Sequence, residues 1–352
     1  MTGPTIVMTG GTSGFGAIAA DRLTQSSGAR LILGSRLPTS AGESVALDLT
    51  ELDSVRAFAA SVRERLGDTP VDALVFNAGV VLPDVAGRTL DGFETTFAVN
   101  HLAHYLLLRL MLPALADKGI VVLTTSGTHD PATRAGLVPP RHADAVLLAH
   151  PDRDPDRDLS TRKAGQHAYT ASKLCAVLTA RSLSEHPDVQ TRRATVVAYC
   201  PGQVFGTGLA KHLSLPLRIV WSLLGTPVGW PLRRLNSNLN SRAAAGRNLA
   251  DIALGVATPP TGRTYAALRR GQLTWPDPSD LARRDDLAQA LWNDSARLVG
   301  LSYKARVRRS EIDGRGEPQA LSLHRAGEGR GDRVPVSRCE VLRPLAGEVD
   351  HV

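Results

Sequence analysis

The chain has 352 residues, of which 43% are hydrophobic and 21% are charged, and its formal net charge is +7. This length is enough to bury one large hydrophobic core. The positive charge is spread along the chain and is small for its length, which argues against nucleic-acid binding and favours an anionic cofactor or substrate. The three cysteines, Cys175, Cys200 and Cys339, have no metal-ligand spacing and form no disulfide framework, so we expect no metal.

No targeting or membrane signal is apparent in the sequence. The first residues lead directly into an apolar strand at 5–9, without the charged and hydrophobic segments of a signal peptide. No apolar run is long enough to span a bilayer. We therefore expect a cytoplasmic protein with no integral membrane segment.

Strand and helix patterns alternate along the chain. Runs rich in β-forming residues occupy 5–9, 30–34, 71–76, 119–125 and 194–199, and helical patterns occupy about 14–26, 51–66, 92–116 and 167–185. Such alternation predicts a parallel sheet covered by helices on both faces. With right-handed crossovers this becomes a doubly wound, Rossmann-type α/β domain, which we assign to residues 1–302.

Three segments depart from this rhythm. Residues 127–166 are rich in Pro, Asp, Arg and His, which predicts a long surface insertion. Residues 207–240 hold an apolar, tryptophan-bearing stretch flanked by arginines, which indicates either a substrate lid with weak membrane contact or a lid helix that covers the core. Residues 303–352 are dominated by Arg, Gly and Glu, which predicts a disordered basic tail.

A glycine-rich loop follows the first predicted strand and opens the first predicted helix. Its sequence from Thr9 to Gly16 is TGGTSGFG. Gly10, Gly14 and Gly16 permit a tight turn and a close approach of the backbone to a pyrophosphate at the helix N-terminus. The loop therefore predicts a dinucleotide cofactor.

The end of the second predicted strand bears on the choice of dinucleotide. It has the sequence Leu33-Gly34-Ser35-Arg36. An acidic residue there would hydrogen-bond the ribose hydroxyls of NAD, whereas an arginine accommodates the additional phosphate of NADP. Arg36 therefore predicts NADP(H) in preference to NAD(H).

Tyr169 and Lys173 lie four residues apart in a predicted helix, so they share one face. A nearby ammonium group favours the phenolate form of a tyrosine because opposite charges attract. A free tyrosine has a pKa near ~10, too high for easy proton transfer at neutral pH. We therefore expect Lys173 to lower the pKa of Tyr169 and make it a usable general acid or base.

These motifs, in this order, resemble the short-chain dehydrogenase/reductase superfamily over about residues 4–300. The resemblance implies a catalytic set in which Ser126 holds the substrate oxygen, Tyr169 transfers the proton, Lys173 assists it, and Asn100 fixes a relay water. It also implies a cofactor pocket formed by Thr9, Gly10, Thr12, Ser13, Gly14, Phe15, Gly16, Arg36, Asp48, Leu49, Asn77, Ala78, Gly79, Tyr169, Lys173, Pro201, Gly202 and Val204.

Within the superfamily, the chain looks most like retinol dehydrogenases and light-dependent protochlorophyllide reductases. The likeness is carried by residues 126–130, by the insertion before Tyr169, and by Cys175 shortly after Lys173. Together with Arg36, the superfamily resemblance implies NADP(H)-dependent reduction of a carbonyl, or oxidation of the matching alcohol, and the apolar stretch at 215–230 indicates a bulky hydrophobic substrate. Two alternatives stay open: a protochlorophyllide reductase-like C=C reductase, for which Cys175 is of interest, and a non-catalytic NADP(H)-sensing regulator.

Two points of the resemblance concern structure outside the catalytic set. Residues 37–42 look like a loop where the superfamily often has a helix, which leaves the adenosine side less enclosed. Relatives often pair through the helices that carry Asn100 and Tyr169, so a homo-oligomer is one expectation. The insertion at 127–166 could cover that surface, which leaves the oligomeric state open.

Overall fold

The computed structural model describes residues 3–25, 28–39, 41–205, 236 and 238–301. They lie within a compact unit, Met1–Lys304. Its main sheet has the strand order β10-β9-β6-β5-β4-β1-β2-β3, and all neighbours are parallel except the edge pair β9 and β10. The strands are β1 (Thr5–Thr9), β2 (Arg30–Ser35), β3 (Glu43–Ala46), β4 (Val71–Phe76), β5 (Leu115–Thr124), β6 (Thr195–Cys200), β9 (Tyr265–Arg269) and β10 (Gln272–Thr274), and a separate parallel pair is formed by β7 (Gln203–Val204) and β8 (Leu239–Asn240).

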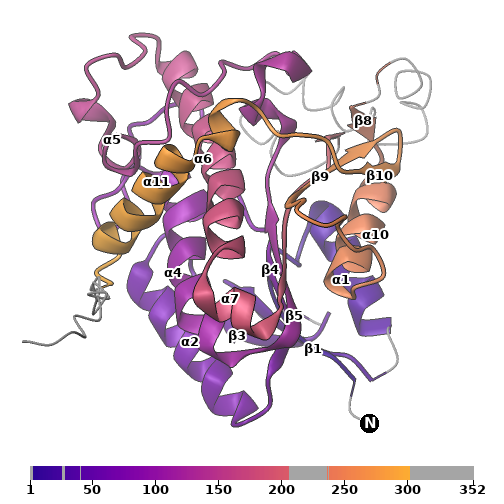
Figure 1. Cartoon of the computed structure of the whole chain (residues 1–352). Coiled ribbons are helices and arrows are strands. Elements are labelled where there is room, and N and C mark those ends of the chain that lie inside the picture. Colours follow the sequence, from indigo (N-terminus) through magenta and orange to yellow (C-terminus); the bar gives the residue numbers. More distant parts are fainter. Residues whose placement is uncertain (1–2, 26–27, 40, 206–235, 237, 302–352) are drawn as a thin grey trace, which may run out of the picture. The chain divides into compact units, whose positions relative to one another are not determined.

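The helices lie on both sides of the main sheet (Figure 1). Their bounds are α1 (Gly14–Gln25), α2 (Leu52–Leu66), α3 (Thr95–Phe97), α4 (Ala103–Met111), α5 (Ala145–Ala149), α6 (Thr161–Ser184), α7 (Pro187–Arg192), α10 (Arg242–Ala253) and α11 (Asp285–Leu298). A π-helical turn, Ala98–Leu102, joins α3 to α4, and short 3-10 turns lie at Leu112–Ala114, Gly127–His129, Pro131–Thr133, Pro151–Arg153 and Leu281–Arg283. None of the helices in the described ranges is long and apolar enough to cross a membrane.

The buried strands supply apolar side chains to both faces of the sheet. Successive side chains of a strand point to opposite faces. In β1, Val7 joins the core beneath α2, α4, α6 and α11, whereas Ile6 and Met8 join the core beneath α1 and α10. The predicted doubly wound α/β fold with a mostly parallel sheet is therefore confirmed.

The predicted helices and strands differ from the observed ones mainly in length, and several observed elements were not predicted. The strands at 5–9 and 71–76 are confirmed to the residue, while β5 begins earlier, at Leu115. Residues 37–39 and 41–42 form no helix, as expected, but they lead into the short strand β3, which was not predicted. The elements β9, β10, α10 and α11 were also missed.

The insertion at 127–166 is more ordered than a surface loop. It contains α5, whose residues Ala145, Leu148 and Ala149 are buried in the core. The prediction of a plain surface loop is therefore wrong for this part, because the α5 side chains add to the core beside α11. The predicted lid at 207–240 lies largely, and the predicted tail at 303–352 entirely, outside the described residues.

The last described helix, α11, is held against α4 and α6. The Tyr105 hydroxyl donates to the Trp292 carbonyl at 2.8 Å, and the Arg109 guanidinium lies 5.1 Å from the centre of the Trp292 ring. The His101 ring and the Ser295 hydroxyl are hydrogen-bonded at 2.8 Å. These contacts place α11 over part of the surface of the helix that follows Asn100.

Gly246 allows α10 to pack closely on α1, and its replacement tests this contact. A Cβ at Gly246 would lie 2.6 Å from the Phe15 carbonyl oxygen and 2.8 Å from the Ile18 Cβ. We expect Gly246→Ala to lower the melting temperature, because overpacking costs about 1–3 kcal/mol and outweighs a gain in helix propensity of about 1 kcal/mol.

Thermal unfolding followed by circular dichroism measures this effect. Ala243→Gly, on the exposed side of the same helix, is the control and should show only the propensity loss of about 1 kcal/mol. A Gly246→Ala protein more stable than wild type would contradict the packing argument.

Candidate active site

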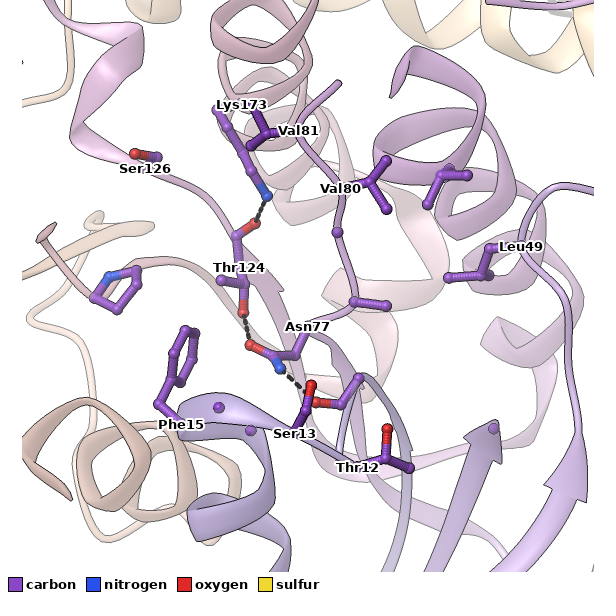
Figure 2. Close-up of a pocket in the computed structure, with 18 of the residues that line it drawn as sticks. Thr12, Ser13, Phe15, Leu49, Asn77, Val80, Val81, Thr124, Ser126 and Lys173 are labelled. Atoms are coloured by element: carbon purple, nitrogen blue, oxygen red, sulfur yellow. Dashed lines mark hydrogen bonds between the residues drawn. The ribbon is translucent and has the colours of Figure 1, made fainter. Parts of the chain in front are cut away.

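A pocket of about 390 Å³ opens at the carboxyl ends of the parallel strands (Figure 2). Ligands of open α/β sheets bind at this edge, where the strand order reverses on either side of the first strand. Every residue predicted from the resemblance to contact the cofactor lines this pocket except Thr9, and the predicted catalytic residues Ser126, Tyr169 and Lys173 line it too. The structure thus brings together residues that are up to about 190 positions apart in sequence, from Gly10 to Val204.

The glycine loop is shaped for close approach to a ligand. Gly10 and Gly14 have φ angles of +69° and +60°, which residues with a Cβ rarely adopt. A Cβ at Gly16 would overlap the Gly10 carbonyl oxygen and would lie 2.5 Å from Asn77 Nδ2. The loop leads into the N-terminus of α1, where free backbone N–H groups and the helix dipole favour a pyrophosphate. These features fit a dinucleotide.

Thr9 lies behind the pocket wall and not in it. Its hydroxyl oxygen accepts hydrogen bonds from the backbone N–H groups of Asn77 and Ala78 at 3.1 and 3.2 Å, and it is bonded to His104 Nε2 at 2.9 Å. Thr9 therefore holds the end of β4 against the end of β1. It supports the pocket wall but does not line the pocket.

Tyr169 and Lys173 are both buried on α6, with exposed fractions of 7% and 6%. Burial raises the pKa of Tyr169 to about 12, although its side-chain hydrogen bond with Ser126 acts in the opposite direction. Burial also lowers the pKa of Lys173 to about 8. The net pKa of Tyr169 is therefore raised and not lowered as expected, because loss of hydration outweighs the effect of the Lys173 ammonium, whose Nζ lies 5.7 Å from the centre of the Tyr169 ring.

Both the side chain and the backbone of Lys173 are hydrogen-bonded, one to the end of strand β5 and the other to the residue after it. Its Nζ donates to the Thr124 carbonyl at 3.2 Å, and its own carbonyl accepts from the Thr125 hydroxyl at 2.6 Å. Helix α6 is thus fixed to strand β5, which ends at Thr124. Lys173, Thr124 and Ser126 lie at the same end of the pocket in Figure 2.

Asn100 does not line the pocket but positions its wall. Its Oδ1 accepts from the Val80 N–H at 2.8 Å, while Nδ2 donates to the Val80 carbonyl at 2.9 Å and to Ser172 Oγ at 3.0 Å. Both amide hydrogens are therefore used by protein groups. This arrangement fixes the segment after β4 to α6, and the role of Asn100 in a water relay stays a prediction.

The adenosine side of the pocket carries Arg36 and Asp48. Arg36 is exposed, and no carboxylate in the described ranges pairs with it. Asp48 Oδ1 accepts from the Thr50 backbone N–H and hydroxyl at 2.9 and 2.7 Å, so this carboxylate is fixed at the pocket edge. The arginine is thus free to meet an anion at the end of β2.

The turn at Pro201 and Gly202 is held by a residue that the sequence analysis did not identify. Asn240 Nδ2 donates to the carbonyls of Pro201 at 3.1 Å and Leu268 at 2.8 Å. Gly202 has a φ of +73°, and a Cβ there would lie 2.5 Å from the Asn238 carbonyl oxygen. The turn that borders the pocket is therefore a tightly packed part of the fold.

The insertion does not line this pocket. None of residues 127–166, all of which are described, contributes to its lining. Instead the insertion borders a separate pocket of about 260 Å³ beside α6, where Arg141 pairs with Asp154 and Asp158, each at 2.7 Å.

Cys175 also lies outside the pocket. It is fully buried, packs in the core under α6, and burial raises the pKa of its thiol. In the described part of the chain, no group of three or more His, Cys, Asp or Glu side chains is arranged to hold a metal ion.

Comparison with known proteins identifies the family. The family model described as short chain dehydrogenase matches residues 4–135. The chain is 31% identical over 322 residues to human retinol dehydrogenase 13, covering 85% of each protein. It is 31% identical over 324 residues to protochlorophyllide reductase B of rice, Oryza sativa subsp. japonica, covering 85% of this chain and 78% of that protein.

A solved structure gives the same result for the fold. A putative uncharacterized protein from Mycobacterium paratuberculosis superimposes with a TM-score of 0.59 at 26% identity, covering 85% of this chain and 94% of that one. Together with the glycine loop and the pocket at the strand ends, these similarities show that the chain belongs to the short-chain dehydrogenase/reductase family and is an NAD(P)-dependent oxidoreductase.

Proposed function

We propose that this enzyme uses NADPH to reduce a carbonyl group on an apolar substrate. The observation that carries the proposal is the placement of Tyr169, Ser126 and Lys173 together in the lining of the pocket. Burial raises the pKa of Tyr169 to about 12, so its hydroxyl is protonated at neutral pH, as that of an ordinary tyrosine is. A protonated tyrosine is a proton donor, which the reductive direction requires. The oxidative direction would require the phenolate.

Each residue of the site has a distinct task in this reaction. The nicotinamide supplies a hydride to the carbonyl carbon when the cofactor is bound. The Ser126 and Tyr169 hydroxyls hold the carbonyl oxygen and stabilise the negative charge that develops on it. Tyr169 then donates its proton to that oxygen, and the Lys173 ammonium, where protonated, favours the transient phenolate. Asn100 keeps the wall at Val80 in place.

The walls near the reactive groups support an apolar substrate. Val80, Val81 and Leu82 line the pocket after β4, and Val80 and Val81 lie near Lys173 in Figure 2. Apolar walls with few polar groups select a ligand by shape and buried area. The relatives named as retinol dehydrogenases are in keeping with such a substrate.

The rice relative favours a second candidate, the reduction of a carbon–carbon double bond. The sequence feature that pointed to it was Cys175. Because Cys175 is buried in the core and lies outside the pocket, it offers no proton donor to a ligand there. The carbonyl reaction, for which Tyr169 and Ser126 are in place, is therefore the better supported of the two.

The proton-donating role of Tyr169 is tested by Tyr169→Phe. Phenylalanine keeps the ring and its packing but has no proton to donate. We expect kcat for reduction of an apolar ketone or aldehyde to fall by at least about 100-fold, with the dissociation constant for NADPH changed little. Steady-state rates from NADPH absorbance and a fluorescence titration measure the two effects, and undiminished turnover would refute the assignment.

The buried Lys173 predicts a pH dependence. With a pKa of about 8, its amine is charged below that pH and neutral above it. Since the charged form favours the developing negative charge, kcat/KM for reduction should decline as the pH rises through about 8. Initial rates between pH 6 and 10 measure the profile, and a rate that stays constant to pH 10 would contradict the role given to the ammonium group.

The preference for NADPH is tested at Arg36. A guanidinium forms strong charge-assisted hydrogen bonds with a phosphate. We expect tighter binding of NADPH than of NADH, and we expect Arg36→Gln to remove most of the difference by weakening NADPH binding at least about tenfold.

The matched control is Arg63→Gln, which removes the same charge from an exposed position on α2 outside the pocket. Fluorescence titration with both cofactors measures the preference. A wild-type preference for NADH, or equal losses in the two variants, would overturn the assignment of Arg36.

A further inference from the structure

A continuous chain of hydrogen bonds runs along the pocket from the glycine loop to Lys173 (Figure 2). Asn77 Nδ2 donates to the Gly10 carbonyl at 2.9 Å, and Thr124 Oγ1 donates to Asn77 Oδ1 at 2.9 Å. The Thr124 carbonyl in turn accepts from Lys173 Nζ at 3.2 Å. Thr124 therefore contacts Asn77, which is bonded to the glycine loop, with its side chain, and contacts Lys173 with its backbone.

The direction of these bonds is fixed by chemistry. The Gly10 carbonyl can only accept, so it takes the amide nitrogen of Asn77 and turns the amide oxygen towards Thr124. That oxygen needs a donor, which the Thr124 hydroxyl supplies. If the hydroxyl were absent, reversing the amide would place two oxygens against each other at Gly10. No orientation of Asn77 keeps both bonds without a donor at position 124.

The glycine loop rests directly on this amide. A Cβ at Gly16 would lie 2.5 Å from Asn77 Nδ2, and a Cβ at Gly10 would lie 2.5 Å from the Ala78 backbone nitrogen. With the loop and Asn77 so close, a displaced amide displaces the loop. Protein interiors have little free volume to absorb such a shift.

We propose that Thr124 is a positioning residue that holds the glycine loop in its cofactor-binding geometry and keeps it in register with Lys173. The proposal rests on the proposed function in one respect, that the pocket is the NADP(H) site. Thr124 acts through Asn77 and has no direct part in the chemistry. Its contribution is to bring cofactor and lysine to a fixed separation.

Valine has nearly the shape of threonine, so Thr124→Val removes the hydroxyl with little change in packing. Thr170→Val is the matched control, because Thr170 is fully buried on α6 and its hydroxyl donates to the Val138 carbonyl at 2.8 Å, outside the pocket. Thr124→Ser keeps the donor and tests rescue. All three variants retain the full chain.

We expect Thr124→Val to raise the dissociation constant for NADPH about tenfold, because an acceptor left without its partner costs free energy. Its KM for NADPH should rise similarly, and kcat at saturating NADPH should change less than KM, because valine keeps the backbone carbonyl that accepts from Lys173 Nζ. Thr124→Ser should restore binding, and Thr170→Val should lose thermal stability but bind NADPH like wild type. Fluorescence titration, steady-state rates and melting curves measure these quantities.

The possible outcomes distinguish a failure of the role given to Thr124 from a failure of the proposed function. Wild-type protein that binds NADPH, together with a Thr124→Val protein that binds it equally well, would overturn the role of Thr124 and leave the proposed function intact. Equal weakening by Thr170→Val would also overturn it, because the loss would then be general destabilisation. Wild-type protein that binds neither NADPH nor NADH would refute the site and this proposal together.

Discussion

The hydroxyl group of Thr9 joins the three elements on which the site depends. Its oxygen accepts from the backbone of Asn77 and Ala78 and is bonded to His104 Nε2 at 2.9 Å. Because two N–H groups point at this oxygen, its own hydrogen is directed to the imidazole, which must accept it at Nε2. His104 is then a neutral ring with its proton on Nδ1, which faces the Asn100 carbonyl at 3.3 Å. Burial favours this neutral form, since it lowers the pKa of His104 to about 4.

A fixed polar framework of this kind explains how the buried catalytic groups are kept in place. Lys173 and Tyr169 lose most of their hydration in the folded chain, and that loss makes an unpartnered position costly. Hydrogen bonds from neighbouring elements offset part of the cost. The Thr124 carbonyl accepts from Lys173 Nζ, and the Ser126 side chain interacts with that of Tyr169. These bonds tie α6 to the end of β5, so the sheet determines the spacing between Tyr169 and the glycine loop.

The sequence predicts the parts of the site that have a local pattern and misses those that depend on distant contacts. The glycine loop can be predicted because its turn requires glycine at positions 10 and 14. The Tyr169–Lys173 pair can be predicted because residues four apart lie on the same face of a helix. The role of Thr124 could not be predicted in this way. A threonine at the end of a strand is common, and its hydrogen-bond partner Asn77 is 47 positions away in the sequence. The sign of the Tyr169 pKa shift was missed for a related reason, since burial is a property of the folded chain and not of the spacing.

The pocket also shows why chemistry and substrate can diverge within such a family. In the proposed reaction, the reacting oxygen is held by the hydroxyls of Ser126 and Tyr169, whose positions are set by the buried framework. In the same proposal, the rest of the substrate contacts apolar walls such as Val80 and Leu82, where one methylene more or less changes binding by only about 1–3 kcal/mol. Small changes in those walls can therefore admit a new substrate without disturbing the framework. Such a division is in keeping with two relatives of equal identity, 31%, bearing the names of a retinol dehydrogenase and of a protochlorophyllide reductase.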